Sequence, residues 1–280
     1  MVTLPAVEAA RRWPTAPALV AQGVSWTHAE LEAASAVLAR RLATAGVAPG
    51  DVVALWGANS PSWVLAAHAV GRAGATLLPL NTRWTDAEVA AALGRLAPRV
   101  LVGDAPLAAR AAGLGVSAWS YEALDGLPPA DGALPEAMPA SAAMAYLLTS
   151  GTTGVPKAVT LTWGQVEASA TAVGQVLALG PADRWWLAMP LFHVGGLGVL
   201  WRCAWHGAAA VIAPRFEAAT APAALARDGV TLASLVPTML RGLLEALGDR
   251  PWPAAVRAVM LGGAAVPPDL VARCPVALAT

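Results

Sequence analysis

Short apolar runs alternate with longer segments of helical period along almost the whole chain. Near the start, residues 18–20 and 24–26 flank Gln22-Gly23 and predict a hairpin. Thr27 and Glu30 then predict a capping box that opens a helix reaching about residue 45. Helical segments separate the later apolar runs, which predicts an α/β protein with mainly parallel sheets. The predicted later strands are 52–56, 75–78, 100–102, 145–149, 158–161, 185–188, 209–213, 232–235, 258–261 and 276–279.

One segment, 125–139, is the best candidate for a linker because it holds four prolines and two glycines. It predicts two subdomains within one large domain over residues 1–280, at about 1–130 and 145–280. The last apolar run, 276–279, is typical of a buried strand. Because functional residues normally follow the carboxyl end of a parallel strand, both a truncated product and a natural end are compatible with this pattern.

The overall composition changes the picture less than it first suggests. Hydrophobic residues make up 57% of the chain, charged residues make up 13%, and the mean hydropathy is +0.56. The longest candidate membrane segment, 185–201, is interrupted by Pro190, His193 and three glycines, whereas a spanning helix needs about 20 mainly apolar residues. Residues 1–12 do not have the pattern of a signal peptide. We therefore expect a cytoplasmic protein without an integral membrane segment.

Charge and cysteine spacing exclude two further classes. Eighteen basic and eighteen acidic residues give a net charge of +0, which leaves no basic surface for nucleic acid. Cys203 and Cys274 lie far apart without CxxC spacing, so the sequence predicts neither a disulfide framework nor a zinc site. The expected partners are small molecules, and a homo-oligomer is compatible with the sequence.

The most unusual stretch, 146–157, contains the only lysine of the chain, Lys157. An apolar strand leads into hydroxyl and glycine residues, followed by a proline and this lysine. Open backbone N–H groups, hydroxyl donors and one positive charge together suit a polyphosphate. The stretch is not a Walker A loop, since Pro156 precedes the lysine and Ala158 follows it. The alternative is an ordinary surface turn rich in glycine and threonine.

This stretch resembles the phosphate-binding signature of the adenylate-forming superfamily, which includes acyl-CoA synthetases, luciferases and the adenylation domains of peptide synthetases. The family usually reads TSGTTGxPKGV, and here Ala158 replaces the last glycine. The resemblance implies catalytic roles for Lys157, Thr152 and His193, and a Mg²⁺ contact for Thr152. It also implies that ATP is bound by Thr149, Ser150, Gly151, Thr152, Thr153, Gly154 and Lys157.

Two further motifs follow in the order that this family would show. In the first, 189–197, an apolar strand ends in an aromatic-histidine pair and a flexible glycine pair. The resemblance implies that this motif and Val236, at a later strand-helix junction, bind the acid. It gives His193 a role in organising substrate and phosphates rather than as a general base, and it implies an adenine wall at Gly262, Gly263 and Ala264. The implied acid-binding residues are Phe192, His193, Gly195, Gly196, Leu197 and Val236.

The resemblance covers the whole chain and implies a large N-terminal domain with two stacked, mainly parallel sheets flanked by helices in αβαβα layers, without the family's mobile C-terminal domain. The implied activity is an ATP-dependent carboxylate-CoA ligase that uses Mg²⁺ and coenzyme A. Within the superfamily, the motifs most resemble the o-succinylbenzoate-CoA ligases of menaquinone synthesis. Three alternatives stay open: a fatty-acid or aryl-acid ligase, a non-catalytic nucleotide- or acid-binding module, and one half of a split enzyme.

Overall fold

The fold was analysed in a computed structural model that describes residues 1–149 and 157–279. Its helices are α1 (Pro5–Arg12), α2 (His28–Thr44), α3 (Pro61–Arg72), α4 (Asp86–Leu96), α5 (Ala105–Ala112), α6 (Tyr121–Asp125), α7 (Trp163–Val176), α8 (Val194–His206), α9 (Ala221–Arg227), α10 (Pro237–Leu247) and α11 (Pro268–Arg273). Its strands are β1 (Val2–Thr3), β2 (Pro17–Ala21), β3 (Val24–Thr27), β4 (Val52–Trp56), β5 (Thr76–Pro79), β6 (Val100–Gly103), β7 (Ala118–Ser120), β8 (Ala137–Met138), β9 (Ala143–Thr149), β10 (Lys157–Thr162), β11 (Arg184–Leu187), β12 (Ala209–Ile212), β13 (Leu232–Leu235), β14 (Ala258–Leu261) and β15 (Ala277–Ala279).

Two large sheets form the framework. A six-stranded sheet has the order β10-β9-β5-β4-β6-β7 and a seven-stranded sheet has the order β15-β14-β13-β11-β12-β2-β3, while β1 and β8 form a small separate pair. Neighbouring strands run parallel in both large sheets, except that β10 is antiparallel to β9 and β3 is antiparallel to β2. This confirms the predicted class of two mainly parallel sheets.

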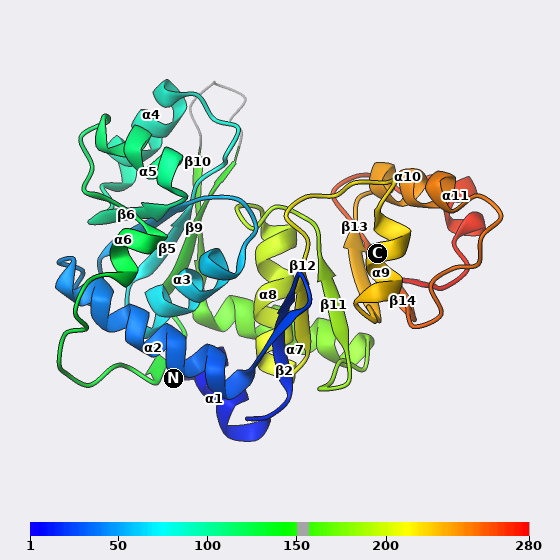
Figure 1. Cartoon of the computed structure of the whole chain (residues 1–280), viewed down its shortest axis with the longest axis horizontal. Helices are drawn as coiled ribbons and strands as arrows, with labels where there is room; N and C mark the ends of the chain where they lie inside the picture. The colour runs from blue at the N-terminus through cyan, green and yellow to red at the C-terminus, as the bar shows by residue number, and fades with distance from the viewer. Residues whose placement is uncertain (150–156, 280) are drawn as a thin grey trace.

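Helices fill the space between the sheets and cover their outer faces, which gives the predicted αβαβα layers (Figure 1). Alternate residues of a strand enter different cores, as the strand period requires. In β4, Val53 and Leu55 join the central core with α2, α3, α7 and α8, whereas Ala54 and Trp56 face α4 and α5. The outer face of the seven-stranded sheet packs against α9, α10 and α11.

Local signals in the sequence correctly placed most element boundaries. The β2–β3 hairpin turns at Gln22 and Gly23, with φ of 50° and 82°, as a two-residue turn with two positive φ values requires. Thr27 and Glu30 form the predicted capping box of α2, with the Glu30 amide 3.2 Å from Thr27 Oγ1. Strands β4, β13 and β14 have the bounds that the sequence predicted.

Sheet membership does not follow the linker at 125–139. The early hairpin β2–β3 belongs to the seven-stranded sheet with β11–β15, and the later hairpin β9–β10 belongs to the six-stranded sheet with β4–β7. Each sheet therefore uses strands from both sides of the linker, because hydrogen bonding with β12 recruits β2 and pairing with β5 recruits β9. The proposed subdomains at 1–130 and 145–280 stay a prediction.

The described residues lack two features that would indicate a function. No helix among the described residues is long and apolar enough to cross a membrane. Within residues 1–149 and 157–279, no group of three or more His, Cys, Asp or Glu side chains could hold a metal ion. Cys203 is buried and Cys274 is half-buried, and neither forms a disulfide.

Candidate functional site

The carboxyl edge of the seven-stranded sheet gathers three of the predicted segments. Residues 189–193 follow β11, Val236 follows β13 and 262–264 follow β14. These strands are parallel neighbours in the order β14-β13-β11. Because parallel strands end at the same edge, segments from distant parts of the chain meet there, where α/β proteins normally bind ligands.

The predicted phosphate loop lies in the sequence between β9 and β10, the two strands of a hairpin. Thr149 and Lys157 face each other across this hairpin, and Thr149 Oγ1 donates to the Lys157 carbonyl at 3.4 Å. Both residues are exposed, and Lys157 forms no ion pair with any described residue. Its ammonium group is therefore available to an anion. The predicted ATP-binding residues between them lie outside the described residues: Ser150, Gly151, Thr152, Thr153 and Gly154, with the predicted Mg²⁺ contact of Thr152.

His193 stands at the N-cap of α8, between the strand-end turn and the helix. Its backbone N–H donates to the Pro190 carbonyl at 3.1 Å, and its carbonyl accepts from the Leu197 amide at 2.9 Å. The neighbouring Phe192 ring lies 4.6 Å from the imidazole, centroid to centroid. His193 is exposed overall, but partial desolvation of its ring and, second, the charge of Arg83 lower its pKa. The imidazole is therefore neutral at pH 7 and can exchange a hydrogen bond with a substrate or phosphate oxygen.

The glycine pair after His193 has a different role from the flexibility that the sequence suggested. A Cβ at Gly196 would overlap the Pro190 carbonyl oxygen and lie 2.7 Å from that of Met189. A Cβ at Gly195 would lie 2.6 Å from Met189 Cε. Both glycines lie within α8, so they allow the first turn of the helix to pack against the preceding turn. Backbone packing thus requires glycine at 196, whereas at 195 the clash is with the movable end of the Met189 side chain.

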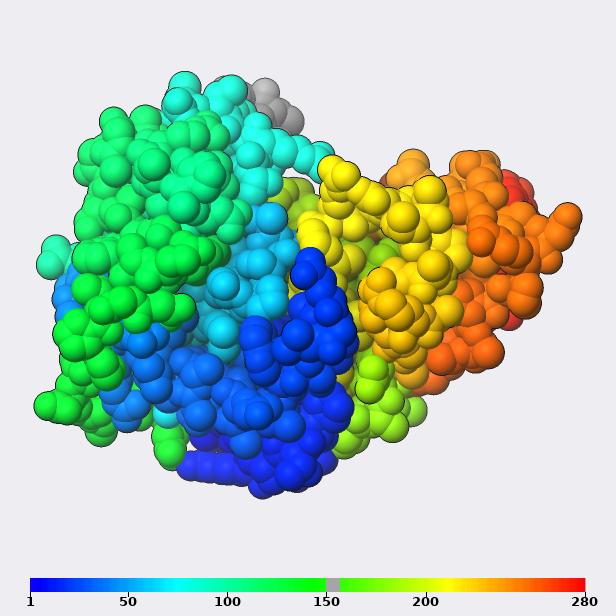
Figure 2. All heavy atoms as spheres, in the orientation of Figure 1, coloured from blue at the N-terminus to red at the C-terminus, as the bar shows by residue number. Residues whose placement is uncertain are grey.

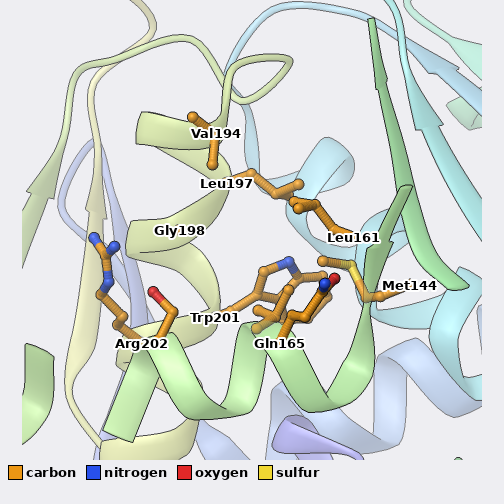
Figure 3. A pocket seen from close by; sticks show the side chains of 10 residues that line it. Met144, Leu161, Gln165, Val194, Leu197, Gly198, Trp201 and Arg202 are labelled. Carbon is orange, nitrogen blue, oxygen red and sulfur yellow. The ribbon is translucent and has the colours of Figure 1, made fainter. Parts of the chain in front are cut away.

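A small apolar cavity of about 100 Å³ opens beside His193, between α7, α8 and the strands β9 and β10 (Figure 3). Typical small-molecule sites are several times larger, so this cavity suits one end of a ligand. Leu197, which the sequence assigned to the acid site, is one of its lining residues. The lining residues are Met144, Leu161, Gln165, Val166, Ser169, Val194, Leu197, Gly198, Trp201 and Arg202.

The sequence analysis missed Arg202, the one formally charged side chain in this lining. Its guanidinium carbon lies 5.8 Å from the centre of the Trp185 ring, and Nη1 lies 3.7 Å from Met260 Sδ. Nε is buried without a hydrogen-bond partner, and no carboxylate of a described residue pairs with the side chain. Burial lowers the pKa of Arg202, but an arginine remains charged. A charged residue within the otherwise apolar α8 was the available signal.

The cavity and Lys157 are connected by β10. Leu161, which lines the cavity, lies four residues after Lys157 on this strand. Residues separated by four positions in a strand share a face, and a rise of about 3.3 Å per residue separates their Cα atoms by about 13 Å. One face of β10 therefore carries both the predicted phosphate lysine and a wall of the cavity.

The predicted adenine wall, residues 262–264, forms an exposed shelf at the carboxyl edge of the seven-stranded sheet. Gly262, Gly263 and Ala264 are exposed, and the Gly262 amide donates to the Leu235 carbonyl at 3.2 Å. Gly263 has a φ of +81°, which favours glycine, and a Cβ there would lie 3.2 Å from Val236 Cγ1. Val236 therefore lies next to Gly263. The surface is also hollowed between the cyan segment after β5 and the yellow segment after β12 (Figure 2).

The other histidines lie away from this edge in structural surroundings. His28 and His68 are buried, and the His68 ring packs edge-on against Trp201 at 4.8 Å. Burial and, second, the influence of His28 lower the pKa of His68 to about 3. His206 Nε2 lies 3.0 Å from the Ala170 carbonyl. These contacts are those of side chains that pack within the fold.

Comparison with known proteins identifies the family. The model of the AMP-binding enzymes matches residues 7–280. The chain belongs to this family. It is 36% identical over 248 residues to the 2-succinylbenzoate-CoA ligase of Geobacillus kaustophilus, covering 89% of this chain and 50% of that protein. The chain therefore spans about half the length of the curated relatives it matches.

Solved structures of other family members share the fold. The o-succinylbenzoate coenzyme A synthetase MenE of Bacillus subtilis, in complex with ATP and magnesium ion, superposes with a TM-score of 0.91 at 30% identity. The match covers 97% of this chain and 57% of that one. A putative long-chain-fatty-acid CoA ligase of Rhodopseudomonas palustris gives a TM-score of 0.86 at 28% identity, covering 98% and 73%. Since both kinds of ligase match, the fold alone does not select the acid.

Proposed function

We propose that the chain is the N-terminal part of an ATP-dependent ligase that joins 2-succinylbenzoate to coenzyme A. Two steps follow from this activity. A carboxylate oxygen of the acid attacks the α-phosphorus of ATP, the bond to pyrophosphate breaks, and an acyl-adenylate remains. The thiolate of coenzyme A then attacks the acyl carbon and AMP leaves. Family membership supports the reaction class, while the choice of acid rests on the cavity beside α8.

The observation that carries this choice is Arg202, a partly buried cation without a carboxylate partner among the described residues. It lines a mainly apolar cavity whose other polar lining residues, Gln165 and Ser169, are uncharged. An unpaired cation in such surroundings is costly unless a ligand supplies the counter-charge. The substrate 2-succinylbenzoate carries two carboxylates on an aromatic ring and its side chain. One carboxylate can react with ATP while the other pairs with Arg202. A fatty acid has no second charge to offer.

The remaining roles follow from position. Lys157 would contact the phosphates, and the shelf 262–264 would lie against the adenine. His193, neutral at pH 7, would donate to or accept from oxygens of the acid or phosphate, and Phe192 and Val236 would border the acid. Because both reactants are anionic, fixed positive charge and orientation supply most of the rate enhancement.

Lys157 suits a role in binding ATP, because its side chain is exposed, charged and without an ion-pair partner among the described residues. Magnesium would neutralise phosphate charge when bound, and Thr152, outside the described residues, is its proposed contact. Coenzyme A is the proposed co-substrate of the second step. The proposed roles of residues 150–154 are carried over from the family signature alone.

The direct test is ATP-pyrophosphate exchange with Mg²⁺ and a matched pair of acids. The first acid is 2-succinylbenzoate, and the second is 4-oxo-4-phenylbutanoate, which has the same side chain but no carboxylate on the ring. We expect kcat/KM to be about 10- to 100-fold higher for the first, the range of one charge-assisted hydrogen bond. Arg202→Ala should abolish this preference, whereas Arg257→Ala, a matched loss of an arginine remote from the cavity, should keep it.

Other outcomes separate the alternatives. Exchange with palmitate and none with 2-succinylbenzoate would overturn the choice of acid and favour a fatty-acid ligase. Silence with every acid, from a cooperatively folded chain that still binds ATP, would show that the 280 residues form a binding module and that adenylation needs further parts. Equal rates with both matched acids would remove Arg202 from the site.

A further inference from the structure

Asn59 is a buried amide that joins the two sheet layers at the proposed acid site. It precedes α3, which packs on the six-stranded sheet through β4 and β5, and its side chain is only 7% exposed. The side chain nevertheless bonds to the strand ends of the seven-stranded sheet. Asparagine occurs only twice in the chain, and no sequence motif marked this one.

The Asn59 amide is surrounded by backbone groups from the ends of β11 and β12. Nδ2 donates to the Met189 carbonyl at 2.9 Å, with the carbonyls of Ala213 and Leu187 at 3.3 and 3.5 Å. Oδ1 accepts from the Leu191 amide at 2.9 Å. The orientation of the amide is determined by these partners, since carbonyls surround the nitrogen and an N–H faces the oxygen. The side chain thus bonds the backbone on both sides of Pro190.

The same turn is held from its other side by α8. Gly196 packs so closely on the carbonyls of Met189 and Pro190 that no Cβ fits there. The His193 amide bonds to the Pro190 carbonyl at 3.1 Å, which closes the turn. The segment 189–193 therefore lies between Asn59 and the first turn of α8, with Phe192 and His193 at its end.

We infer that Asn59 is a positioning residue, which fixes the turn 189–193 and through it the orientation of His193 and the start of α8. Val194 and Leu197, which line the cavity, lie in that first turn. The link to the acid rests on the proposed function, whereas the link to His193 rests on geometry alone. No other standard side chain reproduces the contacts at this length: aspartate would put charge against three carbonyls, and alanine would leave four backbone groups without this partner.

The experiment uses the four histidines of the chain as reporters. Full-length protein labelled with ¹³C-histidine is titrated by NMR, and His193→Gln assigns the resonance of His193. In the wild type, His193 should titrate below the ordinary value of 6.5. In Asn59→Ala its pKa should rise towards 6.5, since a displaced imidazole regains water and leaves Arg83.

The matched control is Thr231→Val, which removes a polar anchor at the opposite edge of the same sheet. Thr231 Oγ1 donates to Asp183 at 2.7 Å and accepts from the Arg184 amide at 3.0 Å. This variant should lower the melting temperature but leave the titration of His193 unchanged. If Asn59→Ala does not fold, Asn59→Ser, which keeps one hydroxyl donor, is measured in its place. An unchanged pKa and unchanged shifts of His193 in the folded Asn59 variant would overturn the inference.

A second readout separates this inference from the proposed function. By calorimetry, Asn59→Ala should weaken the affinity for 2-succinylbenzoate at least about 10-fold, which corresponds to the loss of roughly one charge-assisted hydrogen bond. Thr231→Val should keep the wild-type affinity for this acid. A wild type that does not bind this acid would contradict the proposed function, yet the titration of His193 would still decide the role of Asn59. An equal loss of affinity for the acid in Thr231→Val would indicate general damage and count against positioning.

Discussion

Charged side chains at the amino edge of the seven-stranded sheet form ion pairs within the protein, whereas Arg202, on the helical face of the same sheet, forms none with a described residue. At the amino edge, Asp183 accepts from Arg257 Nε and Nη2 at 2.9 and 2.8 Å and from Thr231 Oγ1 at 2.7 Å. On the helical face of the same sheet, Arg202 of α8 lies against Trp185 and Met260 and pairs with no carboxylate of a described residue. The comparison indicates which polar groups hold the sheet together and which are left for a ligand.

The same contrast extends to the uncharged groups. At the amino edge, Thr231 uses its hydroxyl both as donor and as acceptor within the protein. At the carboxyl edge, the shelf 262–264 is exposed, and His193 caps α8 without a side-chain cap bond. Polar groups that are hydrogen-bonded at one edge and left unpaired at the other are typical of a parallel sheet whose carboxyl edge binds a ligand.

The largest expected effect comes from Lys157. Replacing it by alanine should lower ATP-pyrophosphate exchange about 100-fold or more, because a fixed charge on the phosphates is lost. The thermal melt should not change, since the side chain is exposed and unpaired in the described chain. Lys157→Arg, which keeps the charge, should retain part of the rate. Full activity in the alanine variant would refute the assignment.

The next effect tests whether the carboxyl edge is rigid as well as open. Gly196→Ala should destabilise the fold by about 2–3 kcal/mol, because its Cβ meets two backbone carbonyls that cannot rotate away. Gly262→Ala is the matched control: a Cβ there has nothing within 4 Å, so stability should change by less than about 0.5 kcal/mol. Denaturant melts of the two variants measure the difference, and equal melts would contradict the packing argument.

A smaller effect is expected at the amino edge. Burial alone would raise the pKa of Asp183, but hydrogen bonds from Arg257, Thr231 and the Gly180 amide, with the charge of Arg257, lower it overall. Asp183→Asn should cost about 2 kcal/mol, between an exposed pair and a buried one, since the Arg257 side chain is 40% exposed.

The pH dependence of this cost follows from the sign of the shift. A lowered pKa in the folded state stabilises the protein above the unfolded value of about 3.9, and the contribution is lost as pH falls through the folded value. The stability gap between wild type and Asp183→Asn should therefore be constant near neutral pH and narrow below about pH 4. Urea melts across this range measure it, and a gap that widens in acid would show the wrong sign.

The smallest effect is expected for Arg202→Met. Replacing an unpaired, partly buried cation by an apolar residue should leave stability within about 1 kcal/mol of the wild type or raise it. Arg257→Ala should instead destabilise the fold, since it leaves Asp183 without its ion pair. If Arg202→Met melted well below Arg257→Ala, Arg202 would be a structural residue and the contrast between the edges would fail.

Local signals accounted for most of the secondary structure, because caps and turns depend on residues only a few positions apart. The box of Thr27 and Glu30 needs only residues three apart, and the turn at Gln22-Gly23 needs only two positive φ values. The order of the strands could not be found in this way. The exchange of β2 and β9 between the sheets depends on hydrogen bonds to strands far along the chain.

For the site, the sequence found the residues that belong to contiguous motifs, such as His193 and Gly262. It missed Arg202 and Asn59, each of which stands alone in an apolar or loop segment. Their significance depends on which groups surround them: an apolar cavity without a carboxylate partner in one case, and four backbone groups from two strand ends in the other.

The sequence by itself determined the family, the α/β class and the candidate residues that lie in motifs, because hydrophobic period, capping residues and motif spacing are properties of short stretches. Only the tertiary structure decided which sheet each hairpin joins, that Gly196 serves packing rather than flexibility, and that Arg202 has no carboxylate partner among the described residues. The physical reason is that burial, close contact and charge pairing are relations between residues distant in the chain, which exist only after the layers pack together.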